Sequence, residues 1–369
     1  MINVFQPSLD DKELGALKEV FESNWVGRGS KTDNFIERLS NKINKPSKFM
    51  TTTTCCTEGV FQIMDLLDIQ KGDEVVLPSI SFNGVANAIV YKNATPVFCD
   101  VDKHTLNPTV EDIEKKITPK TKVVIVIHYA GVPCDIDNIA KLCKERDIVL
   151  IEDNANSPFS KYNNQNTGTF GDFGVWSFDA MKVMTTGDGG LIYSKNEDYI
   201  DKLNKLIYLG LETSSGLSST IDKKWWQFEV SVPGRRSIMN DITSAIGIEQ
   251  LKKVDGFIQR RKEIHNIYNS ELDEIDWITT PTIKDEVKSS YFMYHIQLKE
   301  RDELAKYLRL NEIYTTFRYY PLHWVEFYKS KENLSNTDYA ASHTLCIPAH
   351  QSLTNLNLEK IISLIKEFK

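Results

Sequence analysis

The sequence has no long hydrophobic run and no excess of basic residues. Its longest uninterrupted aliphatic run, Val123 to Ile127, is far too short to cross a bilayer. Polar residues occur within the first ten positions, unlike the apolar segment of a secretory signal. Lys and Arg number 44 against 51 Asp and Glu, a formal net charge of -7, whereas nucleic-acid binding needs a basic face. We therefore expect a cytoplasmic protein without a membrane or nucleic-acid partner.

Cysteine and histidine are few and scattered. The 6 cysteines and 7 histidines form no CxxC pair and no HxxxH cluster. The adjacent Cys55 and Cys56 suit neither a zinc knuckle nor an ordinary disulfide. We expect no metal site, and thiols that are reduced and mostly buried.

The glycine turn of dinucleotide-binding proteins is also missing. No GxGxxG segment follows an early strand. The one dense glycine turn, Gly187 to Gly190, leads into Leu191, Ile192 and Tyr193, which predicts a hairpin rather than a nucleotide-binding helix. A dinucleotide-dependent oxidoreductase is therefore disfavoured.

What the sequence does contain is an alternation of short aliphatic runs and amphipathic stretches. Apolar residues make up 41% of the 369 residues and charged residues 26%, as in a globular enzyme. Runs of strand length lie at residues 74–77, 96–99, 122–127, 148–151 and 173–178. Apolar residues at helical spacing lie at 57–67, 83–91, 110–117 and 136–145. Continuous aliphatic strands separated by helices predict an α/β fold with a mainly parallel sheet covered on both faces.

The two ends of the chain have patterns of their own. Ser8, with Asp11 three places later, is typical of a capping box, so we expect a helix to begin there. A long helical stretch is predicted over 238–267, and the rest of the chain mixes short strands and helices. We expect a large domain over residues 1–245 and a smaller C-terminal α+β domain over residues 246–369.

Chemically useful residues stand where predicted strands end and helices begin, the place where parallel sheets bind ligands. Asp153 and Ser177 close two strands, and Lys182 follows closely after the second. Phe82 comes after another strand, and Thr57 begins a helix. A helix N-terminus binds phosphate, a lysine amine can form a Schiff base, and a buried aspartate can keep a pyridine nitrogen protonated. Together they equip a site for pyridoxal phosphate.

Six motifs in order make the chain similar to the DegT/StrS family of sugar aminotransferases, which are fold-type-I pyridoxal phosphate enzymes. The likeness runs nearly end to end, from Trp25 to His350. The motifs are Gly72-Asp73-Glu74-Val75-Val76, Pro96-Val97-Phe98-Cys99-Asp100, Ile151-Glu152-Asp153-Asn154-Ala155, Gly171-Asp172-Phe173-Gly174-Val175-Trp176-Ser177-Phe178, Lys182 and Thr186-Gly187-Asp188-Gly189-Gly190. The resemblance implies a mainly parallel, seven-stranded sheet in the large domain, and a homodimer.

The resemblance also implies roles for individual residues. Lys182 would form the Schiff base with the cofactor, which disfavours the family's dehydrases, because they carry histidine there. Asp153 would face the pyridine nitrogen, and Phe82 would stack on the ring. The plainer interpretations are a surface lysine, a turn aspartate and a core phenylalanine.

Four more residues would surround the cofactor. Asn156 stands where the family usually has glutamine near the ring hydroxyl, and Ser177 matches a serine on the phosphate side. The family's Ser-Gly-Thr phosphate loop is Cys55-Cys56-Thr57 here, so Cys56 replaces a glycine while Thr57 is retained. Adjacent cysteines also suggest desulfurase chemistry, which needs a thiolate nucleophile. At a helix start beneath a phosphate, we favour a packing role for them.

Arginines and a histidine complete the expected site. Arg236 aligns with an asparagine that reaches the cofactor phosphate of the partner subunit. It could bind that phosphate, a phosphate of the substrate, or only solvent. Arg28, Arg318 and His323 lie in segments that line the substrate mouth in relatives, where they could bind a carboxylate or pyrophosphate.

The expected activity is transfer of an amino group from an amino acid, with glutamate implied as donor, to a keto sugar nucleotide. One alternative is an aminotransferase acting on a small phosphorylated ketone or aldehyde. Another is a non-catalytic, cofactor-binding regulator of the same fold. Residues 211–226 show no family pattern, and the acceptor is not identified by the sequence.

Overall fold

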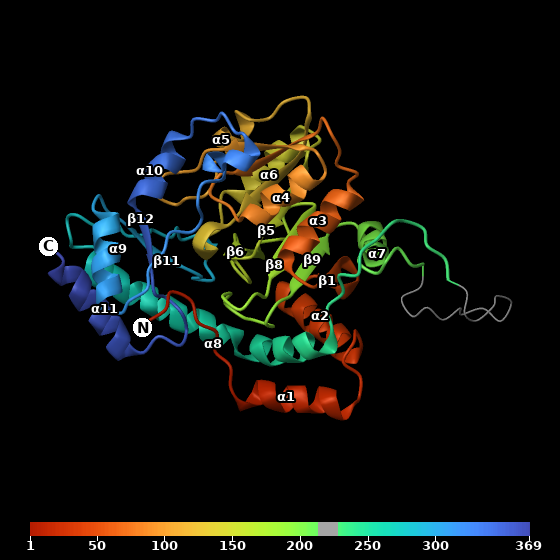
Figure 1. Ribbon diagram of the computed structural model, residues 1–369, viewed down its shortest axis with the longest axis horizontal. Coiled ribbons are helices and arrows are strands. Elements are labelled where there is room, and N and C mark those ends of the chain that lie inside the picture. Colours follow the sequence, from red (N-terminus) through yellow and green to blue (C-terminus); the bar gives the residue numbers. More distant parts are fainter. Residues whose placement is uncertain (213–227) are drawn as a thin grey trace.

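A computed structural model describes residues 1–212 and 228–369 and has a seven-stranded sheet at its centre (Figure 1). The pairs β2–β3, β2–β4, β4–β5 and β5–β8 are parallel, and only β9 runs against its neighbours. The predicted mainly parallel α/β sheet is therefore confirmed. In spatial order the strands are β1 (Met50–Thr53), β9 (Gly190–Ser194), β8 (Phe173–Ser177), β5 (Val149–Asp153), β4 (Thr121–Ile127), β2 (Glu74–Pro78) and β3 (Thr95–Cys99).

Helices cover both faces of this sheet. Alternate residues of β4 face opposite sides: Val123 packs into one core cluster and Val124 into another. The first cluster includes residues of α3 (Cys56–Leu66), α4 (Asn83–Tyr91) and α7 (Glu197–Leu206). The second includes α5 (Val110–Glu114) and α6 (Ile136–Glu145), and a third on the same side joins α2 (Ser30–Ile43) to α8 (Asp241–Leu272).

The glycine turn does lead into a hairpin strand, because β9 pairs antiparallel with β8. The neighbouring strand β1 was not predicted, since its Met-Thr-Thr-Thr sequence is polar although all four residues are buried. Threonine is β-branched and favours strands. Its hydroxyl groups find partners here: Thr51 Oγ1 donates to Asn204 Oδ1 at 2.6 Å and Thr53 Oγ1 to the Cys55 carbonyl at 2.8 Å.

Capping residues shift two helix starts from the expected positions. Helix α1 (Asp11–Glu22) begins after Asp10, whose side chain caps it while Glu13 bonds back to the Asp10 amide at 2.9 Å. The capping box is thus Asp10 and Glu13, not Ser8 and Asp11. Helix α8 begins after Asn240, whose side chain accepts a hydrogen bond from the Thr243 amide.

The C-terminal part has its own core. Strands β11 (Tyr294–Gln297) and β12 (Thr344–Ile347) pair antiparallel, and α9 (Arg301–Leu310) and α11 (Asn355–Glu367) pack around them. Helix α8 connects this core with the central sheet, as Figure 1 shows, and it packs against α1, α2 and α11. The expected boundary at residues 245 and 246 lies within α8, and the division stays a prediction.

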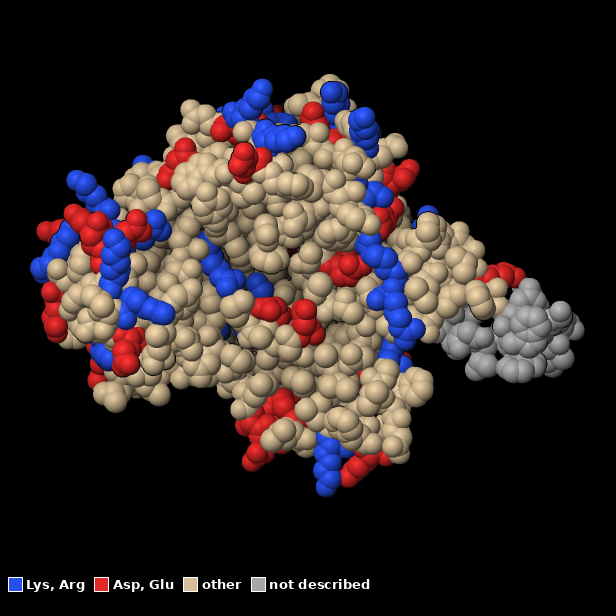
Figure 2. Space-filling model, in the orientation of Figure 1, with Lys and Arg blue, Asp and Glu red and all other residues tan. Residues whose placement is uncertain are grey.

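Smaller elements complete the described chain. They are β6 (Lys161–Tyr162), β7 (Gln165–Asn166) and β10 (Val287–Lys288), which form a small sheet, and α10 (Ser335–His343). Figure 2 shows basic and acidic side chains interspersed over one face of the molecule. No helix within residues 1–212 and 228–369 is long and apolar enough to cross a membrane. Most of the stretch over 211–226 lies outside the described residues.

Candidate active site

A cavity of about 220 Å³ lies at the carboxyl ends of β5 and β8, beside the first turn of α3. The residues that line it are scattered between positions 55 and 319 of the chain, so the tertiary fold brings them together. Seven of its residues were singled out from the sequence as site residues. They are Cys56, Thr57, Phe82, Asp153, Ser177, Lys182 and Arg318. The cavity is also lined by Cys55, Val60, Val85, Ala155, Asp179, Met181, Asp188 and Tyr319.

Lys182 is buried in this cavity, with only 8% of its surface exposed. The plain interpretation as a surface lysine is therefore wrong. Its backbone amide donates to the Asp179 carbonyl at 3.0 Å, and its Nζ lies 5.0 Å from the centre of the Phe292 ring. Gly187, at φ 87°, provides the turn that brings the chain back from Lys182 into β9. No described carboxylate forms an ion pair with Lys182, which leaves its amine available for chemistry.

Asp153 is the buried carboxylate of the cavity, and its Oδ1 accepts a hydrogen bond from the Ala155 amide at 2.8 Å. Burial raises the pKa of Asp153, while the Ala155 hydrogen bond and the charges of Lys182 and His128 act in the opposite direction. A cationic N–H partner would stabilise the ionised form of this buried carboxyl group.

The neighbouring carboxylate, Glu152, is fully used in the fold. Its Oε1 accepts from the amides of Phe170 and Gly171, and its Oε2 from the Gly168 amide, each at 2.7 Å. His128 Nε2 lies 3.1 Å from the same Oε2. Of the two adjacent carboxylates, only Asp153 is left to face the cavity.

The first turn of α3 borders the cavity through Cys56 and Thr57. Cys55 caps this helix through its Sγ, which accepts a hydrogen bond from the Glu58 amide at 3.4 Å. The chain is tight here, since a Cβ added at Gly190 would lie 2.6 Å from the Cys55 carbonyl carbon. Burial raises the pKa of both thiols, that of Cys56 well above its ordinary value. Protonated thiols at a helix start favour packing over a thiolate nucleophile.

Asn156 follows the cavity residue Ala155 and is fully buried. Tyr319 Oη donates a hydrogen bond to its Oδ1 at 3.2 Å, which leaves its Nδ2 buried without a partner in the described chain. Phe82 is 46% exposed at the cavity and its ring centre lies 6.0 Å from that of Tyr319. The plain interpretation of Phe82 as a core residue is therefore wrong.

Arg318 lines the same cavity without an ion pair to any described carboxylate. Its guanidinium lies 4.7 Å from the centre of the Phe5 ring and 5.9 Å from that of Tyr319. Its Nη2 is 3.1 Å from Met181 Sδ. The guanidinium is held on soft, uncharged groups and can accept an anion.

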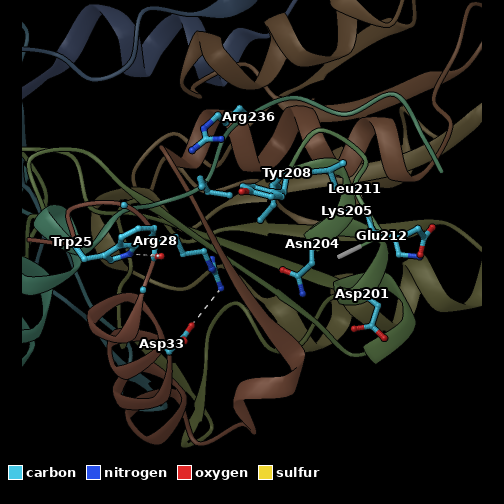
Figure 3. Close-up of a pocket in the computed structure, with 14 residues that line it drawn as sticks. Trp25, Arg28, Asp33, Asp201, Asn204, Lys205, Tyr208, Leu211, Glu212 and Arg236 are labelled. Carbon is cyan, nitrogen blue, oxygen red and sulfur yellow. Dashed lines mark hydrogen bonds and ion pairs between the residues drawn. The ribbon is translucent and has the colours of Figure 1, made fainter. Parts of the chain in front are cut away.

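Arg28 and Arg236 lie elsewhere, in a second cavity of about 960 Å³ (Figure 3). Arg28 is 3.7 Å from Asp33 and donates to Thr52 Oγ1 at 3.4 Å. The guanidinium of Arg236 lies 5.5 Å from the centre of the Tyr208 ring. The structure thus separates these two arginines from the cavity of Lys182 in their own chain.

His323 lines neither of these two cavities. Its Nδ1 lies 2.7 Å from Ser79 Oγ, and its Nε2 lies 3.1 Å from Asp338 Oδ1. Burial lowers the pKa of His323, against the opposing effect of Asp338. Both ring nitrogens have protein partners, so the contact with substrate expected from the sequence stays a prediction.

The sequence did not identify every residue that matters in the cavity. Tyr319 directly follows Arg318 in the sequence, but nothing in its spacing shows that it reaches Asn156. Asp188 lies in the recognised glycine turn. Phe292 and Phe5 carry no sequence signal, because their importance comes from contacts between distant segments.

The chemistry of the cavity fits pyridoxal phosphate. The N-terminus of α3, with Cys56 and Thr57 at the cavity, suits a phosphate. Asp153 suits a protonated pyridine nitrogen, and Lys182 supplies an amine that no described carboxylate pairs with. Among the described residues the amide nitrogen of Asn156 has no acceptor, so it is a donor that a ligand could satisfy.

The chain is similar in sequence to known aminotransferases. The family model of the DegT/DnrJ/EryC1/StrS aminotransferase family matches residues 7–366. The dTDP-4-dehydro-2,3,6-trideoxy-D-glucose 4-aminotransferase of Saccharopolyspora spinosa is 40% identical over 365 residues, covering 98% of this chain and 95% of that protein. These matches extend over nearly the whole chain.

Solved structures of aminotransferases also superpose on this chain. The aminotransferase TlmJ from Streptoalloteichus hindustanus superposes with a TM-score of 0.95 at 43% identity, covering 100% of this chain and 98% of the other. The PMP form of the sugar aminotransferase Spr1654 from Streptococcus pneumoniae, described as putative, superposes with a TM-score of 0.93 at 26% identity, covering 100% and 99%.

Proposed function

The chain belongs to the DegT/DnrJ/EryC1/StrS aminotransferase family, and on this premise we propose that it moves an amino group from glutamate to a keto sugar nucleotide. It is a pyridoxal phosphate-dependent aminotransferase. The observation that supports the proposal best is that Lys182 and Asp153 line one cavity, where Asp153 is buried and Lys182 forms no ion pair with a described carboxylate.

Pyridoxal phosphate, when bound, withdraws electrons from the carbon that carries the amino group and stores that group between the two half-reactions. The amide groups of Cys56 and Thr57 and the hydroxyl of Ser177 would hold its phosphate. Asp153 would keep a proton on the pyridine nitrogen, and Phe82 would cover the ring face. Asn156 would donate its free Nδ2 to the ring hydroxyl.

Lys182 has two tasks in this proposal. Its Nζ would bond covalently to the cofactor in the resting enzyme. The same Nζ would also move a proton to and from the substrate carbon that carries the amino group. Both tasks require an amine that is buried and not paired with a carboxylate. Lys182 is buried, and its Nζ lies over the Phe292 ring rather than beside a described carboxylate.

A homodimer with shared sites would give Arg236 its role. Its neighbour Arg235 is occupied within the chain, with Nε 2.8 Å from Glu58 Oε1 and Nη2 3.2 Å from Asp65 Oδ2. Arg236 forms no ion pair with a described carboxylate and faces the larger cavity. This supports a phosphate partner in the site of the partner subunit, with Arg28 nearby to bind the acceptor.

The proposed acceptor class is supported by the name of the Saccharopolyspora relative, which acts on a dTDP-linked keto sugar. A small phosphorylated ketone or aldehyde is the alternative, favoured by the altered phosphate loop Cys55-Cys56-Thr57 and by Arg236, which forms no ion pair with a described carboxylate. The test is to supply glutamate with either a dTDP-linked 4-keto sugar or small keto phosphates and to identify the aminated product by mass spectrometry. We expect an amino sugar nucleotide and no aminated small phosphate. No product from any keto sugar nucleotide would overturn the proposed acceptor class.

A further inference from the structure

Four residues form a continuous chain of contacts from the lysine amine to the free arginine. Lys182 Nζ lies 5.0 Å from the centre of the Phe292 ring. The rings of Phe292 and Phe5 are stacked, with centres 5.2 Å apart and planes at 20°. The guanidinium carbon of Arg318 lies 4.7 Å from the centre of the Phe5 ring. Both cations line the same cavity, while the two rings pack behind it.

Hydrogen bonds fix the backbone of Phe292. The Phe292 amide donates to the Ala130 carbonyl at 3.0 Å, and its carbonyl accepts from Nη1 of the buried Arg261 at 2.9 Å. Its side chain is only 1% exposed. The ring that contacts Lys182 is therefore held from α8 and from the loop after β4.

Phe5 belongs to the N-terminal segment, which crosses α8 before α1 begins (Figure 1). The Ile2 amide donates to the Glu312 carbonyl at 2.8 Å, and the Tyr314 amide donates to the Ile2 carbonyl at 2.9 Å. Val4 is 2% exposed in the core. The segment is thus anchored on either side of residue 3, and Phe5 is placed against Phe292 from outside the sheet.

An aromatic face holds a cation in a way that a carboxylate does not. It attracts the positive charge but accepts no proton and leaves the hydrogen-bond donors of the cation free. Lys182 and Arg318 form no ion pair with a carboxylate within residues 1–212 and 228–369. The ring stack therefore positions two cations while leaving both able to bind something else.

We propose that Phe5 is a positioning residue of this aminotransferase: through its stack with Phe292 it holds Arg318 ready for the carboxylate of the amino donor beside Lys182. The inference rests on the proposed function for the identity of the donor. The N-terminal segment thereby becomes part of the donor site, although Phe5 itself does not line the cavity.

The test compares Phe5→Leu with Phe49→Leu in the cofactor-loaded enzyme. Phe49 is a matched control, because it is also half-buried against the same core cluster but contacts neither Lys182 nor Arg318. Glutarate, a dicarboxylate without an amino group, reports on carboxylate binding without turnover through the change in cofactor absorbance. We expect Phe5→Leu to weaken glutarate binding about fivefold and to raise the KM for glutamate equally. The KM for the acceptor should not change.

Further variants separate positioning from packing. Phe5→Tyr keeps the ring and should restore glutarate binding. In an Arg318→Gln background, Phe5→Leu should have no further effect on glutarate, because the two residues act as one unit. Equal effects of Phe5→Leu and Phe49→Leu, or additive effects with Arg318→Gln, would overturn the proposal. So would a wild-type enzyme that transaminates glutamate but does not bind glutarate. Failure of the proposed function would show instead as the absence of transamination by the wild type.

Discussion

Tyr319 Oη donates a hydrogen bond to Asn156 Oδ1 at 3.2 Å, although the two residues are 163 positions apart in the chain. The contact fixes the orientation of the amide, so the buried Nδ2 is the donor that has no acceptor in the described part of the chain. The usual glutamine of the family is one methylene longer. In this chain a tyrosine from another segment orients the shorter amide.

The first prediction concerns this pair. Tyr319→Phe removes one hydrogen bond and frees the amide to rotate, so cofactor affinity should fall about 3- to 10-fold. Tyr320→Phe is the control, since that neighbour is 62% exposed and should leave the affinity unchanged. Titration of the apoenzyme with pyridoxal phosphate measures both. Equal affinities for the two variants would contradict the role of Tyr319.

The second prediction concerns Asp153, whose pKa is raised by burial. Its folded pKa lies above its unfolded pKa, so the folded apoenzyme binds a proton that the unfolded chain has lost. The stability contributed by that proton is lost as pH rises through the folded pKa. Asp153→Asn has no proton to lose. The Tm of the apo variant, relative to wild type, should therefore increase from about pH 4 to about pH 7.

Thermal melts of both apoproteins across this range measure the difference. A Tm difference that does not change with pH, or that decreases, would speak against a buried carboxyl that resists ionisation. With cofactor bound, Asp153→Asn should lose at least about 100-fold in kcat, because the neutral amide cannot keep the pyridine nitrogen protonated.

The third prediction concerns the two thiols of the phosphate loop. Because burial raises the pKa of Cys55 and Cys56, both should be alkylated by iodoacetamide near pH 7 more slowly than free cysteine. Cys56→Ser should keep at least about a third of kcat, since a hydroxyl of similar size fills the same place. Mass spectrometry and steady-state rates give the two results. Fast alkylation with loss of activity would support the rejected thiolate chemistry.

The fourth prediction places Arg236 across a subunit interface. Lys182→Arg and Arg236→Ala should each be nearly inactive alone. A mixed dimer has one chain with each substitution. One of its two sites then contains an intact Lys182 from one chain and an intact Arg236 from the other, and this site is complete. Statistical mixing after subunit exchange should therefore restore about a quarter of wild-type activity. Activity that stays absent in verified mixed dimers would place Arg236 in its own chain's site.

The strands and the residues at their ends were predictable because both follow from local rules. Continuous aliphatic runs form buried parallel strands, and the topology brings Asp153, Ser177 and Lys182 to one edge. The strand over 50–53 was missed because its threonines are polar, although their hydroxyl groups are paired inside the fold. The first helix was expected too early because a side-chain contact, from Glu13 back to Asp10, decides its start.

The contacts around Lys182 were beyond the reach of the sequence. Phe292, Phe5 and Arg318 come from three distant segments, and only the packed fold brings their side chains together. The separation of Arg236 from the cavity of its own chain is likewise a tertiary result. A motif identifies which residue stands at a position, whereas the tertiary fold determines which side chains that residue contacts.

The most direct test of the proposed function is the second half-reaction by itself. The enzyme is first converted with glutamate to its pyridoxamine phosphate form and freed of donor, and a dTDP-linked 4-keto sugar is then added. We expect the absorbance of the pyridoxal form to return in one turnover, with an amino sugar nucleotide as product. Lys182→Arg loaded directly with pyridoxamine phosphate should show no return. If no keto sugar nucleotide restores that absorbance, the proposed function is wrong, and its return with a small keto phosphate instead would support the alternative acceptor.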